Sequence, residues 1–152
     1  MKKVAINGFG RIGRLFFRQS FGNKDYVIVA INDLGDLENL AYLLKYDTVY
    51  GTWDKEVLVK DGKLVADGEE IQFTQIKDAT QLPWKSLGID IVIESTGVFE
   101  SYEKAKVHID AGAKRVVITA PAKDEDGVLG KTVLMGVNEG EMSSVALTSN
   151  GS

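Results

Sequence analysis

One stretch decides the fold of this chain: Lys3-Val4-Ala5-Ile6-Asn7-Gly8-Phe9-Gly10-Arg11-Ile12-Gly13. Residues 3–7 predict a short buried strand, and residues 14–20 carry apolar side chains in a pattern that fits a helix. The three glycines between them suit a sharp turn, a close approach to a ligand and tight packing of the helix on the strand, in that order. The stretch therefore predicts the first part of a βαβ unit.

A second apolar strand is predicted over residues 26–32, and Asp33 follows it, twenty residues after Gly13. Backbone N–H groups at a helix start attract phosphates, and a carboxylate at the second strand end can accept hydrogen bonds from both ribose hydroxyls. The same carboxylate would repel a 2′-phosphate, so the unit predicts a dinucleotide site that prefers NAD to NADP. The alternative for Asp33 is a helix or turn cap, as we expect for Asp36.

Downstream, strand and helix patterns alternate. A helix is predicted over residues 101–111, and further strands over residues 89–94, 115–119, 133–137 and 145–148. Between residues 56 and 76, short strands are separated by Asp61-Gly62 and Asp67-Gly68, which are turn dipeptides. We expect a Rossmann-type, doubly wound, mostly parallel α/β sheet with an antiparallel excursion around residues 56–76.

Composition narrows the function. The 152 residues carry a net charge of −4, which argues against general binding of nucleic acids or anionic membranes. There is no cysteine and only one histidine, His108, so we expect no disulfide, no thiol nucleophile and no metal site. His108 is predicted to be structural or exposed. No signal peptide and no membrane-spanning run is predicted, which makes the cytoplasm the expected location.

Several motifs in order resemble the phosphorylating glyceraldehyde-3-phosphate dehydrogenase family. They include Asn7-Gly8-Phe9-Gly10-Arg11-Ile12-Gly13-Arg14, Ala30-Ile31-Asn32-Asp33-Leu34 and Glu94-Ser95-Thr96-Gly97-Val98-Phe99, and also residues 43–51, 82–84, 111–114, 118–123 and 136–139. The resemblance covers nearly the whole chain. It implies a glycolytic oxidoreductase that uses NAD and assembles as a homotetramer.

The resemblance also implies roles for single residues. Arg11 and Ile12 would lie against the pyrophosphate, Lys77 and Phe99 near the adenine, and Thr119 on the nicotinamide side. The cofactor-binding residues implied in this way are Asn7, Gly8, Gly10, Arg11, Ile12, Gly13, Asn32, Asp33, Lys77, Ser95, Thr96, Gly97, Phe99 and Thr119.

Simpler interpretations remain open for several of these positions. Arg11, Arg14 and Lys77 can be solvated surface charges, and Ser95 and Thr96 can cap the helix that follows them.

The chain departs from the family where catalysis would occur. In the family a Ser-Asn-Ala-Ser segment leads into the catalytic cysteine, which a histidine of a second domain activates. Here Ser149-Asn150-Gly151-Ser152 stands at that place, and no cysteine follows. A serine would need an adjacent base. We therefore predict no catalytic residue in this chain, which is expected to stop just before the catalytic cysteine and to lack turnover by itself.

We expect residues 1–150 to form a single NAD-binding domain without a catalytic domain. Residues 151–152 are expected to be a cloning scar, with the alternative that Ser152 is native because it also matches the family. The chain is predicted to bind NAD weakly and to expose apolar surface that favours self-association. Two alternatives stay open: the NAD-binding domain of a related tetrose-phosphate dehydrogenase, and a folding or assembly fragment with negligible NAD affinity.

Overall fold

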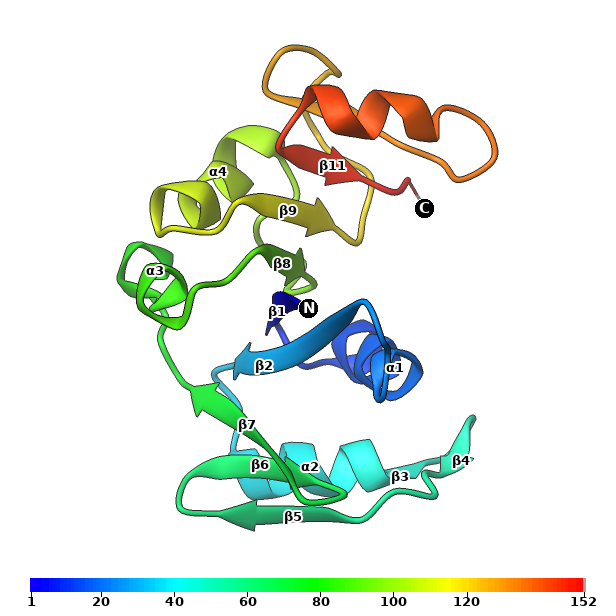
Figure 1. Cartoon of the computed structure of the whole chain (residues 1–152), viewed down its shortest axis with the longest axis vertical. Coiled ribbons are helices and arrows are strands. Elements are labelled where there is room, and N and C mark those ends of the chain that lie inside the picture. The colour runs from blue at the N-terminus through cyan, green and yellow to red at the C-terminus, as the bar shows by residue number, and fades with distance from the viewer. Residues whose placement is uncertain (152) are drawn as a thin grey trace.

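The computed structural model describes residues 1–151, which form one large sheet with helices on both faces (Figure 1). From one edge to the other, its strands are β10 (Gly130–Thr132), β11 (Leu147–Ser149), β9 (Arg115–Ile118), β8 (Ile91–Glu94), β1 (Lys2–Asn7), β2 (Tyr26–Asn32), β7 (Glu69–Thr74), β6 (Lys63–Ala66) and β5 (Val57–Lys60). Neighbours from β10 to β7 run parallel, and only β6 and β5 are antiparallel. The doubly wound α/β fold expected from the sequence is confirmed.

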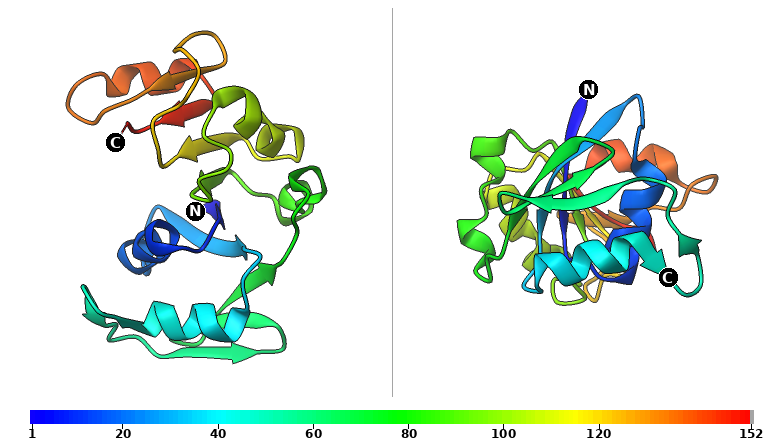
Figure 2. Two further views of the ribbon diagram at one scale, coloured as in Figure 1. Left: turned by 180° about the vertical axis from the view of Figure 1, so that it is seen from behind. Right: turned by 90° about the horizontal axis from the view of Figure 1, so that it is seen from below.

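The helices fill the connections between these strands. They are α1 (Arg11–Ser20), α2 (Leu37–Lys45), α3 (Trp84–Leu87) and α4 (Tyr102–Asp110), with short 3₁₀ turns η1 (Ala79–Gln81) and η2 (Glu139–Ser144). A small hairpin of β3 (Tyr46–Asp47) and β4 (Gly51–Thr52) follows α2. A view from below places α1 and α2 on one side of the strands and α3 and α4 on the other (Figure 2).

Alternation of side chains along the strands divides the core into two layers. In β1, Val4 and Ile6 pack with Phe17 of α1 and Leu44 of α2. Ala5 lies on the opposite face, beside the fully buried Trp84 of α3. Successive residues of a strand point to opposite faces, so a run that is apolar at every position must be covered on both sides. The small side chain of Ala5 leaves room for the indole.

The excursion between residues 56 and 76 has the expected turns. Asp61 and Gly62 have φ angles of 51° and 72°, and Asp67 and Gly68 have 45° and 83°. Two consecutive residues with positive φ match the right-handed twist of a tight hairpin, and Asp-Gly adopts that geometry readily. β7 then returns to the main sheet and pairs parallel with β2.

One predicted strand is wrong. Residues 133–137 do not form a strand: β10 ends at Thr132 and a turn follows, in which Gly136 has a φ of +80°. The N–H groups of Val137 and Asn138 both donate to the carbonyl of Leu134, and the Asn138 side chain accepts from the Leu134 N–H. These local bonds replace the hydrogen bonds that a strand would make to a neighbouring strand, and Met135 and Val137 remain exposed.

Side chains cap the starts of α2 and α4, and the cap of α2 is the one predicted from the sequence. Asp36 caps α2 by accepting the Asn39 N–H at 2.9 Å. Ser101 caps α4 through the Lys104 N–H. No helix within residues 1–151 is long and apolar enough to cross a bilayer.

Asp90 links the amino ends of β1, β8 and β9. Its carboxylate accepts the Lys3 N–H at 2.8 Å and the Lys114 ammonium at 2.6 Å. The Lys114 hydrogen bond first, and then the Lys3 N–H, hold the pKa of this carboxyl below its usual value. A carboxyl whose pKa is lowered by folding stabilises the fold above its unfolded-state pKa, about 3.9, and loses that contribution as pH falls through the folded-state pKa.

We predict that Asp90→Asn lowers the free energy of unfolding at pH 7 and that the loss shrinks as the pH falls below 4. Urea unfolding at several pH values measures this. Lys114→Met is the matched control and should cost less, because it removes only an exposed ion pair and leaves the Lys3 N–H bond. A loss that is the same at pH 3 and pH 7 would contradict the expectation.

Candidate functional site

A cavity of about 440 Å³ lies at the carboxyl ends of β1 and β2, beside the start of α1. The strand order reverses here: β2 lies on one side of β1 and β8 on the other. In open α/β sheets such a switch point is where ligands bind. The residues that line this cavity are Asn7, Gly8, Gly10, Asn32, Asp33, Leu34, Ile76, Lys77, Ala79, Leu82, Ser95, Thr96, Val98 and Phe99.

A second cavity, of about 240 Å³, lies on the other side of the turn that follows β8. It shares Ser95, Thr96 and Phe99 with the first cavity. Its remaining lining residues are Ile12, Glu94, Gly97, Glu100, Ile118, Thr119 and Ala120. Two hollows that meet along one turn provide separate places for the two halves of an elongated ligand.

The structure brings together most of the residues singled out in the sequence. Of the fourteen cofactor-binding positions implied there, all but Arg11 and Gly13 line one of the two cavities. Arg11 is exposed at the first position of α1. Gly13 is buried behind the glycine turn and serves packing instead.

The three glycines of the turn have different reasons to be glycine. Gly8 has a φ of +92°, and a Cβ there would lie 2.7 Å from backbone atoms of Ser95 and Thr96. A Cβ at Gly13 would overlap the carbonyl oxygen of Gly8. A Cβ at Gly10 would meet no atom of the described chain within 4 Å. Packing therefore explains Gly8 and Gly13, whereas at Gly10 the protein leaves open space beside the helix start.

The start of α1 offers free backbone donors. Among residues 1–151 no side chain caps Gly10, and no acidic residue occupies the first turn. The first N–H groups of a helix have no partner inside it, and together with the helix dipole they favour an anion. Open space at Gly10 and an uncapped helix start are what a pyrophosphate would require.

Asp33 is oriented by the backbone. One carboxylate oxygen accepts the Phe9 N–H at 2.6 Å and the other accepts the Gly35 N–H at 2.7 Å. A carboxylate has about four lone-pair sites, so roughly two remain for a ligand. The turn-capping interpretation of Asp33 is therefore correct as far as it goes, and it is compatible with contact to a ribose.

Arg14 supports the glycine turn from behind. It is partly buried, its Nη1 donates to the Phe9 carbonyl at 3.0 Å, and its Nε has no partner among residues 1–151. Burial lowers the pKa of the guanidinium, and the nearby Asp47 and Asp33 carboxylates oppose that effect. Arg14 is therefore a partly buried support of the turn and not the solvated surface charge of the alternative interpretation.

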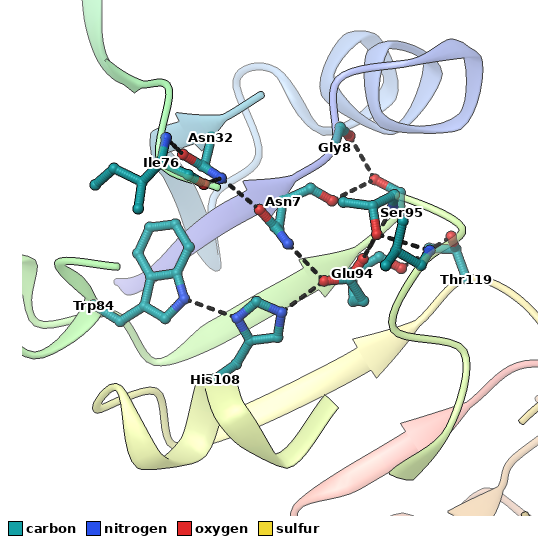
Figure 3. A network of polar contacts seen from close by, with 11 residues as sticks. Asn7, Gly8, Asn32, Ile76, Trp84, Glu94, Ser95, His108 and Thr119 are labelled. Atoms are coloured by element: carbon teal, nitrogen blue, oxygen red, sulfur yellow. Dashed lines mark hydrogen bonds and ion pairs between the residues drawn. The ribbon is translucent and has the colours of Figure 1, made fainter. Parts of the chain in front are cut away.

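A buried chain of polar side chains runs beneath the larger cavity (Figure 3). The Trp84 indole N–H donates to His108 Nδ1 at 3.1 Å, and His108 Nε2 lies 2.6 Å from Glu94 Oε2. The same Glu94 oxygen accepts the Asn7 amide at 2.7 Å, and Asn7 Oδ1 accepts the Asn32 amide at 2.9 Å. All five side chains are at most 5% exposed.

The hydrogen-bond network determines which ring nitrogen of His108 carries the proton. An indole N–H can only donate, so Nδ1 must be the acceptor and the ring proton must sit on Nε2. His108 is then neutral and donates to Glu94. The expectation that His108 is structural or exposed resolves to a buried structural histidine, 0% exposed.

The turn after β8 is fixed by its own side chains. Glu94 Oε1 accepts both the backbone N–H and the hydroxyl of Thr96, and the Ser95 hydroxyl donates to the Gly8 carbonyl at 2.6 Å. Thr119 donates to the Glu94 carbonyl. Ser95 and Thr96 therefore do not cap α4, whose cap is Ser101.

Sequence reasoning missed two residues here, Glu94 and Trp84. The signal available for Glu94 was a carboxylate at the end of an otherwise apolar strand, which must find donors when it is buried. Nothing in the sequence pairs Trp84 with His108. Within the described residues no group of three His, Cys, Asp or Glu side chains could hold a metal ion.

Comparison with known proteins agrees with this geometry. Residues 2–102 match the family model described as the NAD binding domain of glyceraldehyde 3-phosphate dehydrogenase. Glyceraldehyde-3-phosphate dehydrogenase from Thermotoga maritima is 52% identical over 144 residues, which cover 93% of this chain and 42% of that protein. The enzyme from Geobacillus stearothermophilus is 52% identical over 137 residues, covering 90% of this chain and 40% of its own length. The chain thus spans about two fifths of the length of these relatives.

The glycine geometry predicts opposite outcomes for two alanine substitutions. Gly13→Ala should cost about 2 kcal/mol of stability, because its Cβ overlaps the Gly8 carbonyl. Gly10→Ala should cost about 1 kcal/mol or less, since the position is extended and open, but it should abolish most dinucleotide binding. Thermal unfolding and ligand titration of both variants measure this. A Gly10→Ala variant that binds as the parent does would show that the open space is not used.

Proposed function

The chain belongs to the glyceraldehyde-3-phosphate dehydrogenase family through its NAD-binding domain, whose cofactor is NAD, and on that premise we propose that its two cavities hold the two halves of that cofactor. The adenosine half takes the larger cavity and the nicotinamide half the smaller one. The observation that carries this assignment is the open position at Gly10, beside an uncapped helix start and in one cavity with Asp33.

At the adenosine end, Asp33 binds the ribose. Its orientation by the Phe9 and Gly35 N–H groups supports this role, because a carboxylate held in place loses little freedom when a ligand arrives. Its negative charge disfavours a 2′-phosphate. Lys77, Val98 and Phe99 line the same cavity and form its adenine-binding part.

The pyrophosphate lies over Gly10 at the start of α1, where free N–H groups and the helix dipole meet it. Beyond it, Ser95, Thr96, Gly97 and Thr119 border the smaller cavity and receive the nicotinamide side. NAD supplies a hydride acceptor when bound. The chain's own residues bind and orient it, and none of them is assigned to the chemistry.

The whole protein is proposed to be a dehydrogenase of glyceraldehyde 3-phosphate, as the relatives' names state for them, and to depend on NAD, as the matched family model indicates. Its homotetrameric assembly is proposed on the family resemblance, and its cytoplasmic location is proposed on the sequence pattern. This chain contains no cysteine, and the family's acyl transfer needs a thiolate. The chain by itself is therefore a cofactor-binding module.

Isothermal titration calorimetry of the chain with NAD tests the site. We expect a dissociation constant of about 10 μM to 1 mM, nearly equal affinity for ADP-ribose, and markedly weaker binding of NADP. Asp33→Ala should remove most of the binding. The matched control is Asp36→Ala, which removes a helix cap and costs about 1 kcal/mol of stability but lies outside both cavities. Equal loss of affinity in the two variants would contradict the assignment of Asp33.

A turnover assay tests the proposed division of labour. With glyceraldehyde 3-phosphate, inorganic phosphate and NAD, this chain should form no NADH above a protein-free blank, since it has no thiol nucleophile. The full-length enzyme of Thermotoga maritima is the positive control. NADH formation that scales with the concentration of this chain would overturn the proposal.

A further inference from the structure

The buried chain of polar side chains spans four strands of the sheet at the edge where the cofactor is proposed to bind. Glu94 ends β8, Asn7 ends β1 and Asn32 ends β2. Asn32 Oδ1 also accepts the Thr74 hydroxyl at the end of β7 and the Ile76 N–H at 2.9 Å. This chain of polar side chains therefore crosses the switch point between β1 and β8 and connects the two halves of the proposed dinucleotide site.

Glu94 is the residue at which this chain of polar side chains branches. Its Oε2 accepts Asn7 and His108, and its Oε1 accepts the N–H and hydroxyl of Thr96. Four donors leave no acceptor position free, so the carboxylate can rotate only if several bonds break together. Three of these donors, one from Asn7 and two from Thr96, belong to residues that line the larger cavity. The fourth, His108, does not.

His108 reaches Glu94 from outside the proposed binding site. It comes from α4, is held by the Trp84 indole, and touches neither cavity. His108 donates to Oε2 of this carboxylate, whereas the turn at residues 95–98 donates to Oε1 through Thr96. A side chain that only filled the core would not need a donor here, because a buried polar group costs free energy unless its bonds are made.

We propose that His108 is a positioning residue for the dinucleotide site: by donating to Glu94 it holds the carboxylate that fixes Asn7 and the turn at Thr96 in their binding arrangement. The inference rests on the proposed function for the identity of the ligand. The effect of His108 on Glu94 and on the turn at Thr96 does not depend on that function. Thr96 itself is exposed, so we expect its N–H to be protected from exchange chiefly by its bond to the buried Glu94.

Two amide substitutions separate positioning from packing. Glutamine at position 108 keeps an N–H donor within reach of Glu94. Asparagine keeps an acceptor for the Trp84 indole but is too short to reach Glu94. Both are neutral and polar: glutamine keeps the bond to Glu94 and asparagine keeps the bond to the Trp84 indole, so only asparagine loses the bond that the proposal invokes. Leu64→Ala, which truncates a fully buried side chain of β6 away from both cavities, is the control for general destabilisation.

The measurements are calorimetric titration with ADP-ribose and amide hydrogen exchange of Thr96 by NMR, on the full 152-residue chain. We expect His108→Asn to weaken ADP-ribose binding about tenfold, the size of one lost hydrogen bond to a charged group, and to speed exchange at Thr96. His108→Gln and Leu64→Ala should stay within about threefold of the parent in affinity. Equal weakening by Asn and Gln, or unchanged exchange at Thr96 in the Asn variant, would overturn the proposal.

The unaltered chain provides a measurement that needs neither variant nor ligand. Its NMR spectrum should show the His108 ring proton on Nε2 only and a Thr96 N–H that exchanges as slowly as those of the buried strands. A proton on Nδ1, or a rapidly exchanging Thr96, would overturn the proposal even if the variants fail to fold. If the parent binds no ADP-ribose, the proposed function fails, while these two observations still decide the role of His108.

Discussion

The rest of this structure depends on one buried carboxylate. Glu94 sits 3% exposed at the end of a central strand, where an unpaired charge would be very unfavourable. Its four donors come from β1, from α4 and from the turn that follows its own strand. Satisfying this one group therefore fixes the relative positions of three elements. It does so at the edge of the sheet where the cofactor is proposed to bind.

The glycine turn shows how a single motif divides between folding and binding. Gly8 and Gly13 are required by the protein itself, because backbone atoms occupy the space a side chain would take. A Cβ at Gly10 would meet nothing in the described chain, so packing gives no reason for glycine there, whereas the proposed ligand binding does. A helix that packs this closely on its strand presents its first N–H groups to the crevice, and close packing and phosphate binding thus share one geometry.

Asp33 has a similar double role. Its carboxylate caps the turns at Phe9 and Gly35 and retains acceptor positions toward the larger cavity. The two interpretations that the sequence left open for it are therefore not exclusive. Because backbone N–H groups hold its carboxylate, the residue that shapes the glycine turn is also held in place for the ribose contact proposed for it. The chain spans about two fifths of its relatives' length, and the cavity proposed for the adenosine half is already present in it.

The sequence by itself determined the features that depend on neighbours along the chain. The βαβ unit, the Asp-Gly hairpins and the Asp36 cap follow from local periodicity and turn chemistry, which act over a few residues. The placement of site residues at strand ends also followed, because parallel strands present their carboxyl ends at one edge. The same local reasoning failed at residues 133–137, where a continuous apolar run is folded into a turn around Gly136.

Only the tertiary structure decided the partners of the buried polar groups. Asn7 and Glu94 lie 87 residues apart, and Trp84 and His108 24 apart. A polar side chain signals that it needs a partner when buried, but not which distant residue will satisfy it. That choice depends on how the helices pack across the sheet, since a hydrogen bond requires its two atoms within about 3 Å. The tautomer of His108, the orientation of Glu94 and the shape of the cavity above them all follow from that packing.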